Sequence, residues 1–538
     1  MADFQDVNVD GLAPFQNGAA FNTYWTYNPS TKQAFWAQLS SRYTYFGMRY
    51  LQHWLYWYDG WVPYFHNSNN GIFSTKLAQS LVNRISDKVY GGKLMFKNAG
   101  AEQCKHEPNE ALRTVSKWAE HNFCEAFHRA ILYAGAGGTA LIKANRDKRG
   151  LWTEALRVDS FIPTVDFRGN VIRVECFLTQ YADLQQNENG KKAENYYLVE
   201  ERYFGDIETE HVVLHNRPLV RYSIKKASGV VGTGGDVTSV STETVLFGRL
   251  PKQVRRALLK NYNALIFDVP QLLPFHDWLG VELVKWTTNV SDLPMLPFGE
   301  SLLAPIISQL MAYDYYFSAF ATDMYTGRAK VLMPSNMIDP VKAKETQNYN
   351  SNFDSFLYKR YPSRNPESEK PIPLQFDLRA TDWKTIRDTI LENIAVSLGV
   401  NTSTIAGFLG DNNARTAREI STEENETAGY INNKRNILGM SANRYLKHIT
   451  EYLGYADTVD VRWSRAGLTN MQSLAEILNI GLQSGFISKR KAVEMFNLDD
   501  DVMQVEEEYN AIRADDAVRE SNEYAGFGAF GGDERLPK

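Results

Sequence analysis

The stretch Gly407-Phe408-Leu409-Gly410-Asp411-Asn412-Asn413, followed by residues 414–453, decides how this chain is interpreted. Its two glycines interrupt a helical pattern and give the backbone freedom to bend. From residue 414 the pattern is helical again, over about 60 Å at 1.5 Å per residue, and Asn412 or Asn413 is a candidate N-cap. Residues 421–429 are polar on nearly every side, and a helix of that kind needs partners to be stable. We therefore expect a loop that leads into a long helix, whose partners neighbouring copies of the chain would supply.

The composition is that of an ordinary globular protein. The 538 residues are 43% hydrophobic and 22% charged, enough to bury a sizeable core in two to four domains. The formal net charge is -5, with 58 basic and 63 acidic residues. Proteins that coat DNA carry a clustered basic face that releases phosphate counterions. If this chain meets DNA, we expect it to guide the duplex without gripping it.

Cysteine usage and hydropathy point to a protein made in the cytosol. Cys104, Cys124 and Cys176 are too few for a disulfide framework and favour a reducing compartment. The N-terminus has no basic region followed by an apolar one, so we expect no signal peptide. A window of about 18 uninterrupted apolar residues is also missing, so we expect no membrane span.

Three helices are expected in the first 135 residues. Residues 21–65 are rich in aromatics, and large side chains recur there at helical spacing. These side chains are Phe35, Leu39, Tyr43, Phe46, Tyr50, Trp54 and Trp57. A core helix is the favoured interpretation and a subunit-contact helix the alternative. Further helices are expected at about 73–89 and 109–133, the second after Pro108.

From Gly135-Ala136-Gly137-Gly138 the pattern changes to short strands and turns, so residues 135–297 are expected to be β-rich. Strands are expected at 139–143, 171–179, 196–203 and 219–224, with a turn at 168–170 and an exposed loop or hairpin at 228–242.

Helices dominate the remainder. One is expected from about 301 to 325, roughly 40 Å long, and another at 381–398. Between them, residues 328–376 hold eight basic and five acidic residues, a net charge of +3. Shorter helices are expected at 471–482 and 489–496. Residues 496–523 hold ten acidic and two basic residues, and the tail is expected to be flexible.

The sequence lacks the motifs that mark nucleotide-binding and catalytic sites in known enzymes. Gly135–Gly138 and residues 232–235 lack the Lys-Ser/Thr ending of a phosphate-binding loop. Acidic pairs near 499–501 and 506–508 are interpreted as a solvated helix face. Two thiols and two imidazoles are of the residue types that bind zinc, namely those of Cys104, His106, Cys124 and His128. The spacing of these residues along the chain disfavours a zinc site. We expect no catalytic residue, no metal and no cofactor.

Several stretches resemble tailed-bacteriophage portal proteins. Pro-Phe-Gly-Glu-Ser at 297–301, Tyr-Asp-Tyr at 313–315 and Ala-Lys-Val-Leu-Met-Pro at 329–334 resemble the family's central helix. Upstream, residues 134–143 and 158–170 resemble the portal wing. Downstream, residues 415–420 resemble the helix after the tunnel loop, and 477–496 resemble the crown. Each motif is weak by itself, and their order over residues 70–515 is what carries the resemblance.

The resemblance implies an α+β portal fold with a wing, two stem helices that flank a small clip, a tunnel loop with a long helix, and a helical crown. The implied parts are the following: 1–65, an aromatic-rich N-terminal segment; 66–297, wing; 298–327, first stem helix; 328–376, clip; 377–400, second stem helix; 401–414, tunnel-loop region; 415–463, long helix; 464–524, crown; 525–538, flexible tail.

The resemblance also implies a function. A homododecameric ring would occupy one capsid vertex of the virion, after assembly in the host cytoplasm, and would pass double-stranded DNA during packaging and ejection. Its partners would be the terminase large subunit, head-completion or adaptor proteins, and the major capsid and scaffolding proteins, with no membrane involved. Alternatives are another ring-forming connector or tail component, which is usually much shorter, and a DNA-processing enzyme.

Two groups of site residues follow from the resemblance. The tunnel loop, Gly407 to Asn413, would face the DNA, with Arg415 and Arg418 placed to contact phosphates or to pair with Glu419 or Glu423. The clip would bind partner proteins through five basic residues, Lys342, Lys344, Lys359, Arg360 and Arg364. Ordinary surface charge is the alternative for the second group.

Overall fold

The computed structural model describes residues 50–60, 74–91, 94–99, 109–147, 150–183, 194–208, 213–231, 237–262, 265–288, 296–326, 330–334, 358–361, 372–374, 380–402, 405, 417–463, 478–489, 492–493 and 508–514. They belong to two compact units. The larger unit comprises Met1–Tyr58, Gln79–Ala304 and Asn412–Lys538, and the smaller unit comprises Asp59–Ala78 and Pro305–Asp411. Both units combine helices with sheets, which confirms the α+β class. None of the helices described is long and apolar enough to cross a membrane.

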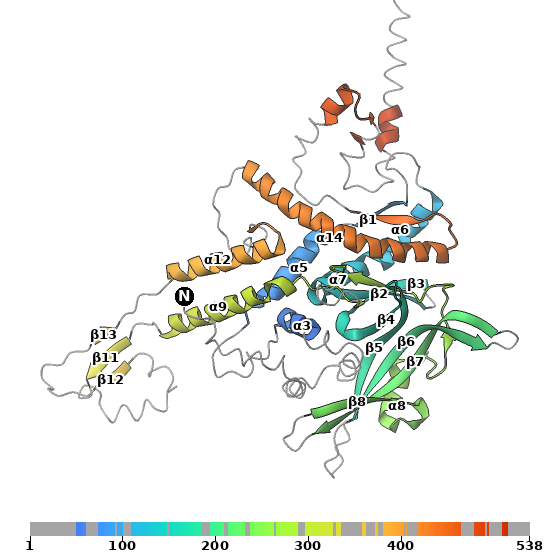
Figure 1. The fold of residues 1–538 in the computed structure, drawn as a ribbon, viewed down its shortest axis with the longest axis horizontal. Helices are drawn as coiled ribbons and strands as arrows, with labels where there is room; N and C mark the ends of the chain where they lie inside the picture. Colours follow the sequence, from blue (N-terminus) through green and yellow to red (C-terminus); the bar gives the residue numbers. More distant parts are fainter. Residues whose placement is uncertain are drawn as a thin grey trace, which may run out of the picture. The chain divides into compact units, whose positions relative to one another are not determined.

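A six-stranded sheet forms much of the larger unit (Figure 1), with the order β4-β5-β6-β7-β8 and with β9 added to β7. The strands are β4 (Phe161–Val165), β5 (Val171–Asp183), β6 (Glu194–Glu208), β7 (Val213–Val231), β8 (Val237–Val245) and β9 (Gln271–Leu272). All of these pairs are antiparallel, as short connections between successive strands allow. The helix α8 (Lys252–Asn261) packs its Val254 and Leu258 into a buried cluster with side chains of β6 and β7.

A three-stranded sheet of the larger unit has the order β10-β2-β3 and packs against a helix. Its strands are β2 (Thr139–Asp147), β3 (Gly150–Arg157) and β10 (Val281–Lys285). The helices before it are α6 (Glu110–Asn122) and α7 (Cys124–Gly137), and α7 contacts both β2 and β3. Ala140, Leu141 and Ile142 of β2 are fully buried, so this sheet lies in the core.

Buried charges connect the six-stranded sheet of the larger unit with its three-stranded sheet. The ammonium group of Lys143, on β2, donates to Glu200 Oε2 on β6 at 3.0 Å. Arg202 donates to Glu200 Oε1 at 2.6 Å and to the backbone carbonyl of Ala144 at 2.9 Å. Burial alone would raise the pKa of Glu200, but the charges of Lys143 and Arg202 outweigh it and lower that pKa to about 2. The carboxylate therefore stays charged and holds both cations.

The long helix α14 (Ala417–Tyr452) has 36 residues, about 54 Å at 1.5 Å per residue. Its second half is buried along one side, as the 3.6-residue period requires, through Ile431, Leu438, Ala442, Tyr445, Leu446 and Ile449. Beside it, β1 (Leu94–Asn98) and β14 (Val459–Trp463) form a two-stranded antiparallel sheet. Arg435 Nε donates to the carbonyl of Val89 at 2.8 Å, near the end of α5 (Leu77–Tyr90).

The smaller unit contains two helices and a small sheet. The helices α9 (Ile307–Thr326) and α12 (Ala380–Leu398) lie side by side (Figure 1). Between them in the sequence come three strands with the sheet order β12-β11-β13, namely β11 (Lys330–Pro334), β12 (Tyr358–Tyr361) and β13 (Ile372–Leu374). β11 pairs parallel with β12 and antiparallel with β13.

The expected single helix at 109–133 is wrong. The structure has two helices there, because Phe123 ends α6 and begins α7 with backbone angles of φ -114° and ψ -44°. The Phe123 ring is fully buried and stacks on Tyr445 of α14, with 5.4 Å between centroids. Tertiary packing thus sets the break, which local periodicity does not reveal.

The described part of the aromatic N-terminal segment lies in the core. The helix α3 (Gln52–Asp59) carries Trp54 and Trp57, and both indoles are buried. This confirms the core interpretation for these two residues, while residues 35–49 lie outside the described residues.

Candidate functional site

The expected tunnel loop falls largely outside the described part of the chain. Residues 407–413 and Arg415 lie outside the described residues, and Arg418 lies in the first turn of α14. The expectation of a long helix in this region is confirmed, because α14 spans Ala417–Tyr452. The role of the loop stays a prediction.

The structure places two of the five expected clip cations on one strand. Lys359 and Arg360 lie on β12, in register with Leu332 and Met333 of β11. The other three, Lys342, Lys344 and Arg364, lie outside the described residues. The three described strands thus form a small sheet that comes between α9 and α12 in the sequence.

Aromatic packing makes α9 and α12 an antiparallel helical hairpin. The centroids of three α9 rings, Tyr313, Phe317 and Phe320, lie 6.1, 5.5 and 5.3 Å from that of Trp383 on α12. Near the opposite end of the pair, Gln309 Nε2 donates to Ser397 Oγ at 3.3 Å. Trp383 is near the start of α12 and Ser397 near its end, so the two helices run in opposite directions. We call this pair the hairpin.

A buried carboxylate lies in the hairpin. Asp314 is 3% exposed and accepts hydrogen bonds from the backbone N–H of Thr75 at 3.1 Å and from its hydroxyl at 2.5 Å. Burial raises the pKa of Asp314 to about 6, although the Thr75 bonds work in the other direction. At neutral pH the buried side chain is therefore ionised at a cost to stability.

A second group of contacts fixes the chain just before the hairpin, within the larger unit. The last carbonyls of a helix have no partner inside it. At the end of α7, the Gly135 carbonyl accepts the N–H of Leu302 at 3.0 Å. The Ser301 hydroxyl lies 2.9 Å from that carbonyl and 2.7 Å from the Ala136 carbonyl, and it accepts the N–H of Leu303 at 3.1 Å. Residues 301–303 thereby cap α7.

Two glycines allow the end of α7 and residues 299–303 to lie close together. Gly138 has a positive φ of 81°, and a Cβ atom there would lie 2.1 Å from the carbonyl oxygen of Gly299. A Cβ atom on Gly299 would lie 2.6 Å from the carbonyl oxygen of Thr287. The Gly299 N–H donates to Thr139 Oγ1 at 2.8 Å. We call this set of contacts among residues 135–139, 287 and 299–303 the anchor.

The zinc alternative gains no support from the described residues. His128 Nε2 lies 2.9 Å from Asp87 Oδ1, and its ring stacks on Tyr90 with 4.4 Å between centroids. Cys104 and His106 lie outside the described residues. Among those that are described, no three His, Cys, Asp or Glu side chains gather as metal ligands.

Ser301 and Asp314 occur within motifs that the sequence marks, whereas no motif marks Thr75 as the partner of Asp314. An aspartate among apolar residues of an expected helix is a usable signal of a buried carboxylate. A threonine 239 positions away carries no such signal, because nothing local marks it as the partner.

One family model matches most of the chain and confirms the expected family. Residues 115–519 match the family model described as phage portal protein, SPP1 Gp6-like. Among similar solved structures, the neck of a native GTA particle computed with C12 symmetry has 10% identity and a TM-score of 0.39, over 78% of this chain and 89% of that chain. The neck of an empty GTA particle computed with C6 symmetry has 10% identity and a TM-score of 0.40, over 79% of this chain and 90% of that chain. Comparison with curated protein sequences gives no match.

A substitution at Gly138 tests the anchor. We expect Gly138→Ala to lower the free energy of unfolding by about 2–5 kcal/mol, because it adds left-handed backbone strain and a clash with Gly299. Urea unfolding followed by circular dichroism measures the change. Gly248→Ala is the matched control, since a Cβ atom there meets nothing within 4 Å. Equal stability of the two variants would contradict the anchor.

The pH dependence of stability tests the burial of Asp314. Because the folded pKa lies above the usual value, the protonated form is favoured in the fold, and stability falls as pH rises from about 4 to about 6. Asp314→Asn keeps an acceptor for Thr75 and removes the charge, so we expect a higher melting temperature at pH 7.5. The gain should be on the order of 2–3 kcal/mol.

Melting curves between pH 4 and pH 8 measure this effect. Glu392→Gln, at an exposed position on α12, is the control, and we expect its melting temperature to follow that of the wild type across the pH range. A profile of Asp314→Asn that matches the wild type at every pH would show that Asp314 is not buried as a charge.

Proposed function

The chain belongs to the SPP1 Gp6-like phage portal proteins, and from that premise we propose that twelve copies form a closed ring at one capsid vertex, through which double-stranded DNA is packaged and ejected. The family is structural, so the chain is a portal-type component of the virion and not an enzyme. The family match over residues 115–519 is the observation that carries the proposal.

The parts of a portal are assigned along the chain in this proposal. The wing is 66–297, the first stem helix 298–327, the clip 328–376, the second stem helix 377–400, the tunnel-loop region 401–414, the long helix 415–463 and the crown 464–524. Residues 1–65 precede the wing and 525–538 form the tail. The hairpin of α9 and α12, with its three-stranded sheet between them in sequence, supports the assignment of stem and clip.

The hairpin is suited to a stiff part of a channel wall. Its core is aromatic, with Phe320 stacked on Trp383 at an interplanar angle of 10°. Large rings bury much apolar area at little loss of side-chain freedom, which makes a stiff contact. Stiffness is what a passage needs if it is to keep its width while a duplex moves through it.

DNA would meet the ring at the tunnel loop. Residues 407–413 would project toward the duplex, and Arg415 and Arg418 would contact phosphates, unless they pair with Glu419 or Glu423 of a neighbouring copy. The overall charge of -5 favours passage over tight binding, because affinity for DNA grows with the number of phosphates that a protein neutralises.

The basic clip would dock other proteins. Lys342, Lys344, Lys359, Arg360 and Arg364 lie in an insert of net charge +3 within an acidic chain, a contrast that favours an acidic partner surface. The terminase large subunit would bind there during packaging and head-completion or adaptor proteins afterwards. Major capsid and scaffolding proteins would contact the ring during head assembly in the host cytoplasm.

A different connector or tail ring is the second candidate. Such subunits are usually much shorter and lack two stem helices around an insert. The presence of α9, β11–β13 and α12 in this order favours the portal.

Deleting residues 407–413 tests the channel assignment. We expect the variant to assemble into rings, because α14 packs through its second half, and to lose packaging or retention of DNA. Electron microscopy of rings and DNA content per particle are the two readouts. Removal of seven tail residues, 525–531, is the length-matched control. Normal DNA content in particles built with the loop deletion would refute the tunnel-loop assignment.

A further inference from the structure

The helix α8 of the larger unit carries a row of cations on its outer side (Figure 1). Lys252, Arg256 and Lys260 are all exposed. They follow one another at intervals of four residues, so they lie on the same side of the helix. Residues 244–267 hold five basic residues and no acidic one, within a chain of net charge -5. We call Lys252, Arg256 and Lys260 the α8 stripe.

The α8 stripe has no counter-ion within the described part of the chain. No carboxylate there pairs with Lys252, Arg256 or Lys260. Like charges four residues apart on a helix repel each other and lower the stability of the helix. The stripe therefore destabilises α8 in the isolated chain, and an anion from outside the chain would offset this repulsion.

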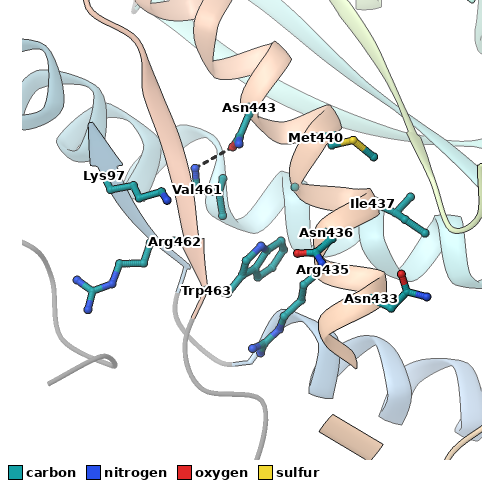
Figure 2. A pocket seen from close by; sticks show the side chains of 11 residues that line it. Lys97, Asn433, Arg435, Asn436, Ile437, Met440, Asn443, Val461, Arg462 and Trp463 are labelled. Carbon is teal, nitrogen blue, oxygen red and sulfur yellow. Dashed lines mark hydrogen bonds between the residues drawn. The ribbon is translucent and has the colours of Figure 1, made fainter. Parts of the chain in front are cut away.

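Two other cations of the larger unit have partners within the chain. The guanidinium of Arg435, beside a hollow that α14 and β14 line, lies 5.5 Å from the centroid of the Trp463 ring (Figure 2). It also donates to the backbone carbonyl of Val89 at 2.8 Å. Arg444 Nε donates to Glu282 Oε1 at 2.8 Å. These two cations hold elements of the larger unit together, which the cations of the α8 stripe do not do.

The helix that carries the stripe is fixed to the large sheet. Val254 and Leu258, on its inner side, are 3% and 1% exposed and belong to a buried cluster with residues of β6 and β7. Just before the helix, the Phe247 ring stacks on Phe267 with 4.5 Å between centroids, and the Phe247 N–H donates to Asp268 Oδ2 at 2.8 Å. A pre-organised backbone loses little freedom on binding, so a ligand of the stripe meets cations that are already aligned.

The length and composition of the α8 stripe favour duplex DNA as its ligand. Lys252 and Lys260 are separated by about 12 Å along the helix at 1.5 Å per residue, and the major groove of B-DNA is about 12 Å wide. The two end cations can therefore reach phosphates on both strands. Interfaces between proteins are depleted in lysine, and residues 244–267 offer no anion to the cations of a protein partner. A phosphate backbone carries negative charge alone, which matches a surface of this kind.

We propose that the α8 stripe binds the phosphates of double-stranded DNA and is a second DNA contact of this chain, separate from residues 407–413. The inference rests on the proposed function, which brings duplex DNA to the chain. Lys252 and Lys260 contact phosphates of opposite strands, and Arg256 lies over the groove between them. Cations that neutralise phosphates release counter-ions, so this contact weakens as the salt concentration rises.

The salt dependence of binding to a duplex tests the contact. The full-length protein is titrated into a fluorescent duplex of about 30 base pairs, and anisotropy is read between about 50 and 200 mM NaCl. We expect the triple variant Lys252→Gln, Arg256→Gln, Lys260→Gln to bind about 10- to 100-fold more weakly at the lowest salt concentration. The slope of log Kd against log salt concentration should fall by about 2 to 3, because each lost phosphate contact removes about 0.9.

The matched control removes the same net charge elsewhere on the larger unit. It replaces three exposed cations of α6 and α7 by glutamine, namely Arg113, Lys117 and Arg129. The control should bind the duplex as the wild type does, and both triple variants should keep the wild-type circular dichroism spectrum, because every changed side chain is exposed. Lys252→Arg with Lys260→Arg keeps the charges of the stripe and should keep the affinity.

Equal binding of the duplex by the triple variant and its control would overturn the inference. Leu246, Leu259 and Ile266, in the same stretch of chain, are exposed and would suit an acidic protein, so poly-L-glutamate is a second probe. If the wild type binds it more tightly than a duplex of equal charge, the ligand is an acidic protein, and this inference fails while the ring stands. Electron microscopy of the same samples tests the proposed function separately, since a wild type that forms no ring contradicts that proposal whatever the duplex does.

Discussion

A close backbone approach in the larger unit, between Gly138 and Gly299, sets the path of the chain on both sides of it. The last carbonyls of α7 need partners, and residues 301–303 supply them through the Ser301 hydroxyl and the Leu302 N–H. The same turn starts β2, which carries Lys143 toward the large sheet. One capped helix end therefore connects β2 of the larger unit with the chain that leads to the hairpin. Side chains at either glycine are excluded, because a single Cβ atom would push the two segments apart.

Buried charges are treated differently in the two units. In the larger unit, Glu200 lies between Lys143 and Arg202, which lower its pKa to about 2. In the smaller unit, burial raises the pKa of Asp314 to about 6, with Thr75 as a hydrogen-bond donor. The first arrangement locks two sheets together over the whole physiological pH range. In the second arrangement, the buried charge of Asp314 lowers the stability of the fold, and the aromatic packing of the hairpin offsets this loss.

Sequence periodicity predicted the long helices well and the tight contacts poorly. The helix expected at 381–398 is α12 (Ala380–Leu398), because a continuous apolar stripe marks it. The break at Phe123 was missed, since it depends on Tyr445 more than 300 residues away. The strand expected at 219–224 extends over Val213–Val231. The added residues include many polar ones, which show no alternation of apolar and polar side chains, and they belong to the strand because they pair with β6. For the site, the sequence located Asp314 within a motif, but its Thr75 partner comes from the fold alone.

The central claim is that this chain builds a closed ring with a passage for duplex DNA, in keeping with its family. Negative-stain electron microscopy of the purified full-length chain, together with its native mass, tests that claim most directly. The account predicts a cyclic particle of about twelve copies with a central hole, since identical heterologous contacts close into a ring. A monomer, or an open filament without a hole, at concentrations up to the micromolar range would contradict it.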